Sequence, residues 1–294
     1  MRVVVTGGAG FIGSHVADAF LARGDEVVVV DDLSTGKREN VPAGAELIEA
    51  DITEGLDVAC ELVCHLAAQA SVTASVADPL RDARVNVLGT LNVCRLGAPV
   101  IYAATGGALY GDAAPRPTRE DFQPQPQSPY GASKLAGEGY VGAWGRLHSL
   151  PNAVLRLANV YGPRQSAEGE AGVVAIFSEH LARGEAPTLR GDGTQTRDYL
   201  YVADAAEAFV RAADAARSGV FNVATGVATS TARVLELLQE AAGTSLEPRR
   251  VPLQPGEMQD SLLDPSRVRE ELGWSPRVAV EDGLRETFRW YASQ

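Results

Sequence analysis

The chain has 294 residues, of which 45% are hydrophobic, and a net charge of −12 at pH 7. This acidity argues against nucleic acids and anionic membranes as partners, and an anionic substrate needs arginines placed close to it. No apolar run approaches the roughly 18 residues of a membrane-spanning helix. No signal peptide precedes the first apolar run, so we expect a cytoplasmic protein of one large domain or two closely packed ones.

The three cysteines, Cys60, Cys64 and Cys94, are an odd number without a secretion signal, so we expect no disulfide framework. Cys60 and Cys64 lie near His65, a grouping that could hold a metal. No second pair of ligands accompanies them, and the surrounding stretch is apolar, so we expect no metal. His65 is expected to be a hydrogen-bonded core residue.

A β-branched run over residues 2–6 ends in a turn that contains Gly7, Gly10 and Gly13. An amphipathic segment follows, and a second β-branched run over 26–31 ends in an acid. The order of strand, glycine turn, helix, strand and acid is that of a dinucleotide-binding unit. Glycines let backbone N–H groups approach a pyrophosphate, and the helix N-terminus adds partial positive charge.

Asp31 closes this unit and can accept hydrogen bonds from both hydroxyls of the adenosine ribose. A 2′-phosphate would meet two negative side chains, Asp31 and Asp32, so the sequence favours NAD over NADP. The polar loop that follows, with Ser34, Thr35 and Gly36, is suited to wrapping the ribose. A third strand over 45–50 ends at Asp51-Ile52. This pair could hold adenine, although by itself an ordinary strand end is the preferred interpretation.

Strand and helix patterns alternate up to residue 160, which predicts a doubly wound parallel sheet of the Rossmann type in an α/β fold. The connection before the fourth strand is short, so its crossover helix must be brief. Small residues end that strand and would let a cofactor lie against the backbone. The predicted elements are strands over 61–68, 99–104 and 154–159 and helices over 86–93 and 133–144.

Beyond residue 160 the pattern becomes rich in loops, which predicts a smaller C-terminal substrate-binding lobe over the carboxyl edge of the sheet. We assign residues 1–163 to the Rossmann domain, with a returning segment at about 198–224. Residues 164–197 and 225–294 form the smaller lobe, with one helix over 173–183.

Tyr130 and Lys134 lie one helical turn apart, on one face of a predicted helix. An unperturbed tyrosine has a pKa of about 10, so a base that works near neutrality needs a pKa lower by roughly three units, or about 4 kcal/mol. The lysine ammonium and a positively charged nicotinamide ring are the sources that we expect for this shift.

Five motifs in order now carry a resemblance that runs essentially end to end. They are the turn over 6–13, the segment 65–68, Tyr130-x-x-x-Lys134, the segment 159–164 and the triplet 197–199. The chain resembles the extended short-chain dehydrogenase/reductases and, within them, the UDP-glucose (UDP-galactose) 4-epimerases. The resemblance implies that the chain inverts C4 of a UDP-sugar through a transient 4-keto intermediate, with an NAD that is regenerated in each cycle. It also implies a homodimer formed partly by the helices that carry Asn86 and Tyr130.

The resemblance implies the following cofactor-binding residues: Gly7, Gly10, Phe11, Ile12, Gly13, Asp31, Asp32, Ser34, Thr35, Gly36, Asp51, Ile52, Leu66, Ala67, Ala68, Asn86, Tyr130 and Lys134. For Asn86 two interpretations stay open. It supports the lysine through the helix backbone or a water, or it is a buried structural asparagine.

The resemblance implies Thr105, Tyr130 and Lys134 as the catalytic residues, with Tyr130 as the base and Thr105 bonded to the sugar O4. Relatives commonly have a serine where this chain has Ala104, which leaves Thr105 as the hydroxyl before the glycines. The implied substrate-binding residues are Thr105, Gly106, Tyr130, Asn159, Val173, Arg197 and Ser261.

Two of the substrate positions bear on specificity. Arg197 matches an arginine that pairs with the diphosphate; the alternative is a surface ion pair with Asp198. Gln254 replaces a second phosphate-binding arginine of the family, which removes one charge from the site. Ser261 aligns with a gate near C2 of the sugar, and its small size predicts that N-acetylhexosamines are tolerated as well as plain hexoses.

Alternatives within the superfamily are a sugar-nucleotide 4,6-dehydratase, a decarboxylase and a 4-ketosugar reductase. Related dehydratases have Asp-Glu after the catalytic threonine, where this chain has Gly106-Gly107. Asp31 and Asp32 disfavour the NADPH of a reductase.

An alternative from another class is a non-catalytic relative that senses NAD(H) and binds a partner. Such a protein is expected to lose Tyr130 or Lys134, and both are present. Ala104, Gln254 and the short crossovers near 52–60 and 94–99 keep this alternative open.

Overall fold

The computed structural model describes residues 1–111, 113–168, 172–253 and 259–294. Within them the largest sheet is parallel and has seven strands in the order β10-β6-β5-β4-β1-β2-β3. The order reverses direction on either side of β1, which confirms the predicted doubly wound sheet. Its strands are β1 (Arg2–Thr6), β2 (Glu26–Asp31), β3 (Glu46–Glu49), β4 (Leu62–His65), β5 (Val100–Thr105), β6 (Ala153–Leu157) and β10 (Gly219–Val223).

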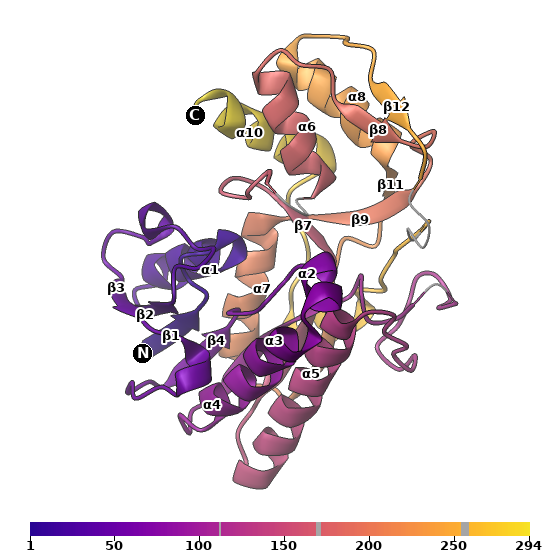
Figure 1. Cartoon of the computed structure of the whole chain (residues 1–294). Helices are drawn as coiled ribbons and strands as arrows, with labels where there is room; N and C mark the ends of the chain where they lie inside the picture. Colours follow the sequence, from indigo (N-terminus) through magenta and orange to yellow (C-terminus); the bar gives the residue numbers. More distant parts are fainter. Residues whose placement is uncertain (112, 169–171, 254–258) are drawn as a thin grey trace.

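Each face of this sheet is covered by helices, because alternate β-branched side chains point to opposite sides. Val3 and Val5 pack with α1 (Phe11–Ala22) and α7 (Val202–Ala215), whereas Val4 packs with helices of the other face. That second layer contains α4 (Thr90–Cys94) and α5 (Pro129–His148), the long helix at the bottom of Figure 1. The helices on the two faces do not cover the edge of the sheet where the strands have their carboxyl ends.

The helix predicted over 86–93 begins earlier, at Pro79, and consists of three consecutive helical segments without a gap between them. They are α3 (Pro79–Ala83), the π-helical turn η3 (Arg84–Gly89) and α4, and the short α2 (Val72–Ala77) precedes them. Asp78 caps α3 by accepting from the backbone of Arg81, and Pro79 starts the helix. The predicted short crossover after Asp51 is the single 3₁₀ turn η2 (Ile52–Glu54); another, η1 (Arg38–Asn40), follows β2.

The strand predicted over 154–159 is wrong at its end, because β6 stops at Leu157 and the chain changes sheets. Asn159 starts β7 (Asn159–Tyr161), which pairs with β9 (Thr196–Tyr201). β9 also pairs with β11 (Ala228–Ser230) in a three-stranded sheet. This small sheet lies between the large sheet and the helices above it (Figure 1).

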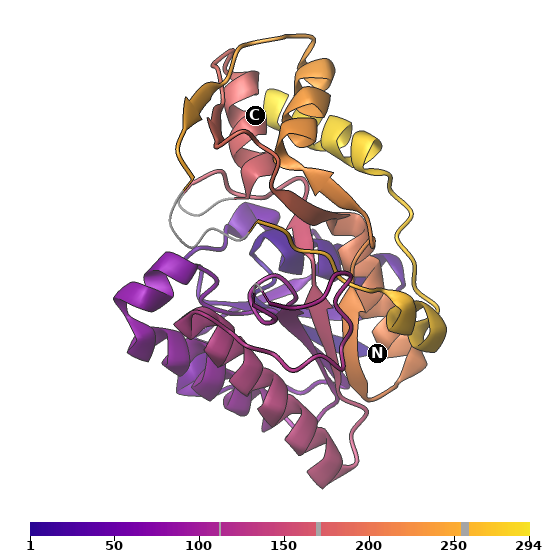
Figure 2. The same ribbon diagram turned by 90° about the vertical axis from the view of Figure 1, so that its right-hand side faces the viewer.

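The upper part of the molecule is built from α6 (Val173–Ala182), α8 (Thr231–Ala242) and α10 (Val280–Ala292) around a core of their own. The ribbon pair β8 (Thr188–Arg190) and β12 (Arg249–Val251) borders it, as Figure 2 shows from the side. By contrast, α9 (Ser266–Leu272) packs with α7 on the large sheet. None of the described helices is long and apolar enough to cross a membrane.

Candidate active site

The glycine turn after β1 is packed so closely that side chains are excluded from it. Gly7 has a φ of +71°, and a Cβ there would lie 2.6 Å from the backbone nitrogen of Ala67. A Cβ on Gly13 would overlap the carbonyl of Gly7. Helix α1 begins at Phe11, and its N-cap Gly10 offers no capping side chain, so the first N–H groups of the helix suit an anion such as a pyrophosphate.

Asp31 fixes this turn from the end of β2. Its carboxylate accepts from the backbone of Ala9 at 3.0 Å and from that of Leu33 at 2.9 Å, and burial raises its pKa. Gly36 lies against it, since a Cβ there would be 2.7 Å from Oδ1. The acid and the loop predicted to wrap the ribose therefore lie together.

Asp32, Ser34 and Thr35 form the exposed part of that loop. The Asp32 carboxylate accepts from the backbone and the hydroxyl of Ser34, at 2.9 and 2.7 Å. Asp51 accepts from the backbone of Thr53, and Ile52 is buried in the core beneath Gly89. These structural contacts of Asp51 and Ile52 are those expected at an ordinary strand end.

The residues present fit NAD. The glycine turn, the uncapped start of α1 with Phe11 and Ile12, and the acid at the end of β2 lie at the crevice between β1 and β4, where the strand order reverses. Residues 66–68 form the other wall, where the backbone of Leu66 and Ala67 donates to Thr6.

Tyr130 lies in the first turn of α5, directly against the loop that follows β5. Ser128 caps the helix by accepting from the backbone of Gly131, and a Cβ on Gly131 would lie 2.6 Å from the carbonyl of Ala108. This close approach brings Tyr130 to Thr105, with which it forms a hydrogen bond. The structure therefore brings together two of the three predicted catalytic residues, and Lys134 follows one turn later in the same helix.

Lys134 is buried, with 4% of its surface exposed. Its ammonium donates to the carbonyl of Ala103 at 2.9 Å and lies 4.8 Å above the centre of the Tyr102 ring. Burial lowers the pKa of Lys134 to about 8. Burial also raises the pKa of Tyr130 to about 12, although the hydrogen bond with Thr105 lowers it. The groups of the chain alone therefore do not bring the phenol near neutrality, contrary to the strong effect that we expected from Lys134.

Asn86 is buried in η3, where its side chain bonds to residues of three different segments. Its side chain accepts from the backbone of Gln69 at 2.9 Å and donates to the Gln69 carbonyl, to Asp82 and to the Ser133 hydroxyl. These bonds clamp the loop after β4 to the catalytic helix, next to Lys134. Asn86 is therefore a buried structural asparagine, and its bond to Ser133 supports the catalytic helix.

The possible metal ligands near β4 are core residues. Thr6 and Thr90 bond both nitrogens of the His65 ring, at 2.7 and 2.9 Å, and burial lowers its pKa to about 3. Cys64 is buried in β4 as a free thiol. In the described part of the chain, no group of three or more metal-ligating side chains occurs.

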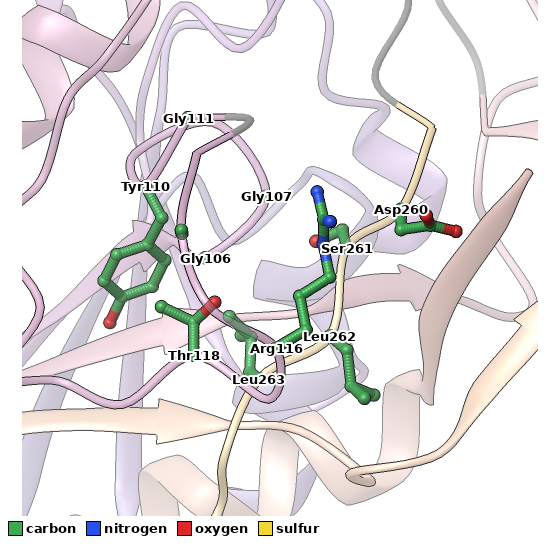
Figure 3. A pocket seen from close by; sticks show the side chains of 11 residues that line it. Gly106, Gly107, Tyr110, Gly111, Arg116, Thr118, Asp260, Ser261, Leu262 and Leu263 are labelled. Atoms are coloured by element: carbon green, nitrogen blue, oxygen red, sulfur yellow. The ribbon is translucent and has the colours of Figure 1, made fainter.

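The segment 259–264 crosses the carboxyl edge of the site and fixes Ser261. Ser261 donates its N–H to the carbonyl of Thr196 at 3.1 Å, while Thr118 donates to the carbonyl of Leu262 at 2.9 Å. The segment is thus bonded to β9 on one side and to the loop after β5 on the other. Ser261 faces a pocket that Gly106 and Gly107 also line (Figure 3).

Arg116 lines the same pocket and was missed from the sequence. Figure 3 shows its side chain running toward Ser261, with Asp260 to one side. A signal existed, because an anionic substrate of so acidic a chain needs local arginines and Arg116 lies between the Thr105 motif and Tyr130.

Arg197 lies in β9 and donates to the carbonyls of Thr196 and Gln259, at 2.8 and 3.0 Å. The alternative of an ion pair with Asp198 is wrong, because Asp198 is buried and its carboxylate accepts from Thr225 and Gly226. Asn159 is exposed at the start of β7; a Cβ on Gly107 would lie 3.9 Å from its side-chain oxygen. Val173 begins α6, and Gln254 lies outside the described residues.

A buried ion pair behind the site was also missed. Arg156 in β6 bonds both carboxylate oxygens of Glu138, at 2.5 and 3.0 Å, and donates to the hydroxyl of Tyr110 at 2.7 Å. Tyr110 donates in turn to Asn222. Glu138 follows Lys134 by one turn in the catalytic helix. The ion pair therefore ties this helix to β6, and the bond from Arg156 to Tyr110 ties both to the loop that follows Thr105.

The comparisons with known proteins agree with this geometry. A family model described as the NAD dependent epimerase/dehydratase family matches residues 3–224. A UDP-glucose 4-epimerase from Mycolicibacterium smegmatis is 44% identical, over 100% of this chain and 99% of that protein. The structure of a UDP-glucose 4-epimerase from Thermotoga maritima with UDP-glucose has a TM-score of 0.93 and 42% identity, over 100% of this chain and 99% of that one. The structure of a UDP-glucose 4-epimerase from Thermus thermophilus with NAD has a TM-score of 0.88 and 43% identity, over 99% of both chains.

These findings confirm the family, the fold class and the cofactor that the sequence predicts. The chain belongs to the NAD-dependent epimerase/dehydratase family, and it is an NAD-dependent epimerase.

Proposed function

We propose that this enzyme interconverts UDP-glucose and UDP-galactose by inverting C4 of the sugar. The observation that carries the proposal is the arrangement of Tyr130, which bonds to Thr105, one helical turn from the buried ammonium of Lys134. The match to UDP-glucose 4-epimerases over whole chains supports the choice of substrate.

In this reaction Tyr130 takes the proton of the C4 hydroxyl, and Thr105 holds the same oxygen by a hydrogen bond. NAD, when bound, supplies the hydride chemistry by accepting hydride from C4 and returning it to the other face of the sugar. Tyr130 then gives its proton back to O4. Since there is no net oxidation, the chain has to keep its NAD through every cycle.

Tyr130 becomes a base only with help from positive charge. Burial is the main cause that raises its pKa to about 12, so the chain's own groups keep the phenol protonated. Lys134 is fixed one turn away by the Ala103 carbonyl and contributes one positive charge. A nicotinium ring in the crevice contributes a second, and the two together favour the phenolate.

The UDP part is assigned to the edge formed by β9 and the segment 259–264. A guanidinium suits a diphosphate by its fork geometry, and Arg197 is held there by two backbone carbonyls. Asn159 and Val173 are proposed to contact the diphosphate or the sugar, and Arg116 adds a second cation to the sugar pocket.

Ser261 is proposed to admit an N-acetyl group at C2. Its small side chain lines the pocket opposite Gly106 and Gly107, and hydrogen bonds on both sides fix its backbone.

The two glycines also place no acid after Thr105, so nothing there is suited to expel water as a 4,6-dehydratase does.

A homodimer is proposed to form through the helices around α5. Exposed apolar side chains gather on α2, α3, η3 and α5, which pack on one another on the outer side of the molecule (Figure 1). Exposed apolar area of this kind is typical of an interface. The side chains are Val72, Val76, Leu80, Leu88, Tyr140 and Leu147, with exposed fractions between 40% and 82%. The cytoplasmic location and the domain limits stay predictions.

The experiment is to incubate the purified protein with UDP-glucose, UDP-N-acetylglucosamine or UDP-glucuronate without added reductant or oxidant. The released sugars are then assayed for inversion at C4. We expect UDP-galactose from UDP-glucose and no net loss of sugar. Formation of a 4-keto-6-deoxy sugar or a pentose in its place would overturn the proposal in favour of a dehydratase or a decarboxylase.

A further inference from the structure

Asp82 is a buried carboxylate that the reaction described above does not use. It lies in α3 with 1% of its surface exposed, and α3 packs on the catalytic helix α5. One of its oxygens accepts from Gln69 at 2.8 Å and from Asn86 at 3.1 Å. The other oxygen is buried and has no hydrogen-bond partner among the described residues. A carboxylate in such a place is costly unless positive charge lies nearby.

Lys134 and Tyr130 lie within the electrostatic field of Asp82, across the contact between α3 and α5. Asp82 raises the pKa of Lys134 and also that of Tyr130, so its field reaches both members of the catalytic pair. The other titratable groups that face the pair, His65 and Tyr102, are uncharged near neutral pH. His65 has a pKa lowered to about 3, and the phenol of Tyr102 is buried with a raised pKa.

Glu138, one turn beyond Lys134, is neutralised by its ion pair with Arg156. Among the described residues, Asp82 is therefore the carboxylate whose charge the catalytic pair feels without a cation of its own to offset it.

A chain of hydrogen bonds also links Asp82 to the base. Asn86 donates both to Asp82 and to the hydroxyl of Ser133, at 3.1 and 2.9 Å, and Ser133 donates to the carbonyl of Tyr130 at 3.0 Å. The same carboxylate holds the side chain of Gln69, in the loop that forms one wall of the NAD crevice. Asp82 thus contacts the loop after β4 directly and reaches the catalytic helix through Asn86.

We propose that Asp82 is a positioning residue of this active site, whose buried carboxylate keeps Lys134 charged beside Tyr130 and fixes Gln69 and Asn86 against the catalytic helix. The inference rests on the proposed epimerase activity. A lysine ammonium and a nicotinium ring place two positive charges in one buried site, and the phenolate balances one of them. The carboxylate of Asp82 balances the other.

The test is Asp82→Asn, which removes the charge but keeps an oxygen that can accept from Gln69 and Asn86. Since Asp82 raises the pKa of both Tyr130 and Lys134, its loss lowers both. Both limbs of the pH profile of kcat should therefore move to lower pH. Asp82→Ser removes the same charge and must move the limbs in the same direction.

The matched control is Asp78→Asn. Asp78 is exposed one turn earlier, at the N-terminus of the same helix, where asparagine also caps well, so the protein loses the same charge at a position where solvent screens it. Its profile should coincide with that of the unmodified enzyme.

A second readout does not need turnover. Tyrosine labelled with ¹³C at Cζ reports ionisation of Tyr130 in the NAD-loaded protein, and Tyr130→Phe assigns the signal. We expect the midpoint to move to lower pH in Asp82→Asn and to stay unchanged in Asp78→Asn. Reduced kcat with both limbs and the midpoint unmoved would leave Asp82 as scaffolding only and overturn the proposal. An unmodified enzyme without epimerase activity would instead refute the proposed function, and the midpoint would still decide the effect of the charge.

Discussion

The ammonium of Lys134 donates to the backbone carbonyl of Ala103 at 2.9 Å, so the catalytic helix is bonded to the strand that ends at Thr105. This bond and the close approach of Gly131 to Ala108 hold Thr105 and Tyr130 at a fixed separation. The relative position of hydroxyl and phenol is therefore set by backbone contacts, and substitutions of either side chain can be interpreted chemically.

Thr105→Val should weaken the base and move its pH dependence. The hydrogen bond with Thr105 lowers the pKa of Tyr130, so its loss raises that pKa. The limb of the pH profile that reports Tyr130 should move to higher pH, and kcat should fall roughly 10- to 100-fold. Thr105→Ser keeps the hydroxyl and serves as the control. A shift toward lower pH in the valine variant would contradict the role given to Thr105.

Tyr130→Phe should abolish most of the turnover without loss of cofactor. Removing a general acid–base group typically costs about 10²- to 10⁴-fold in rate. The glycine turn is held by its bonds to Val30 and Asp31, so NAD content measured on the denatured protein should stay the same. Tyr140→Phe, at an exposed position of the same helix, is the control. Near-normal turnover of Tyr130→Phe would remove Tyr130 from the mechanism.

The sequence predicts the glycine turn, the parallel sheet and the Tyr130–Lys134 pair, because each rests on local spacing. It does not predict the sheet change at Asn159, since the partner of β7 is β9, which lies far along the chain. Apolar periodicity continues through this break and gives no sign of it.

The same limit explains the site residues that were missed. Asp82 and Arg156 matter through partners on other elements, and such partners become known only once the chain is folded. An aspartate one helical turn before Asn86 was the available signal for Asp82. The raised pKa of Tyr130 likewise depends on burial, which the motif alone does not define.

Ser261→Tyr should separate plain hexoses from N-acetylhexosamines. A large ring at this position of the pocket wall fills the space proposed for the C2 substituent, while hydrogen bonds to Thr196 keep the backbone in place. We expect kcat/KM for UDP-N-acetylglucosamine to fall at least about tenfold more than that for UDP-glucose. Ser261→Ala should keep both activities. Equal losses on both substrates would show that the residue does not discriminate at C2.

Leu80→Glu and Leu147→Glu should each weaken the proposed homodimer. These leucines are 82% and 74% exposed on α3 and α5, and a buried carboxylate at an apolar interface is unfavourable. Light scattering coupled to size exclusion should show a shift toward monomer for both variants. Val227→Glu is the control, because Val227 is 59% exposed and belongs to the loop between β10 and β11 rather than to these helices. Unmodified protein that runs as a monomer would refute the dimer itself.

The ion pair between Glu138 and Arg156 should matter more for stability than any exposed pair. Glu138→Gln leaves a buried guanidinium without its partner, which we expect to lower the free energy of unfolding by about 3 kcal/mol. The double variant Glu138→Gln with Arg156→Met should cost less than the sum of the single changes, because neither charge is then left unpaired. Urea denaturation with NAD present at a fixed concentration measures these differences. Glu236→Gln removes the exposed partner of Arg233 in α8 and should change stability by less than about 0.5 kcal/mol. A Glu138→Gln effect as small as that of this control would show that the buried pair does not hold the catalytic helix to β6.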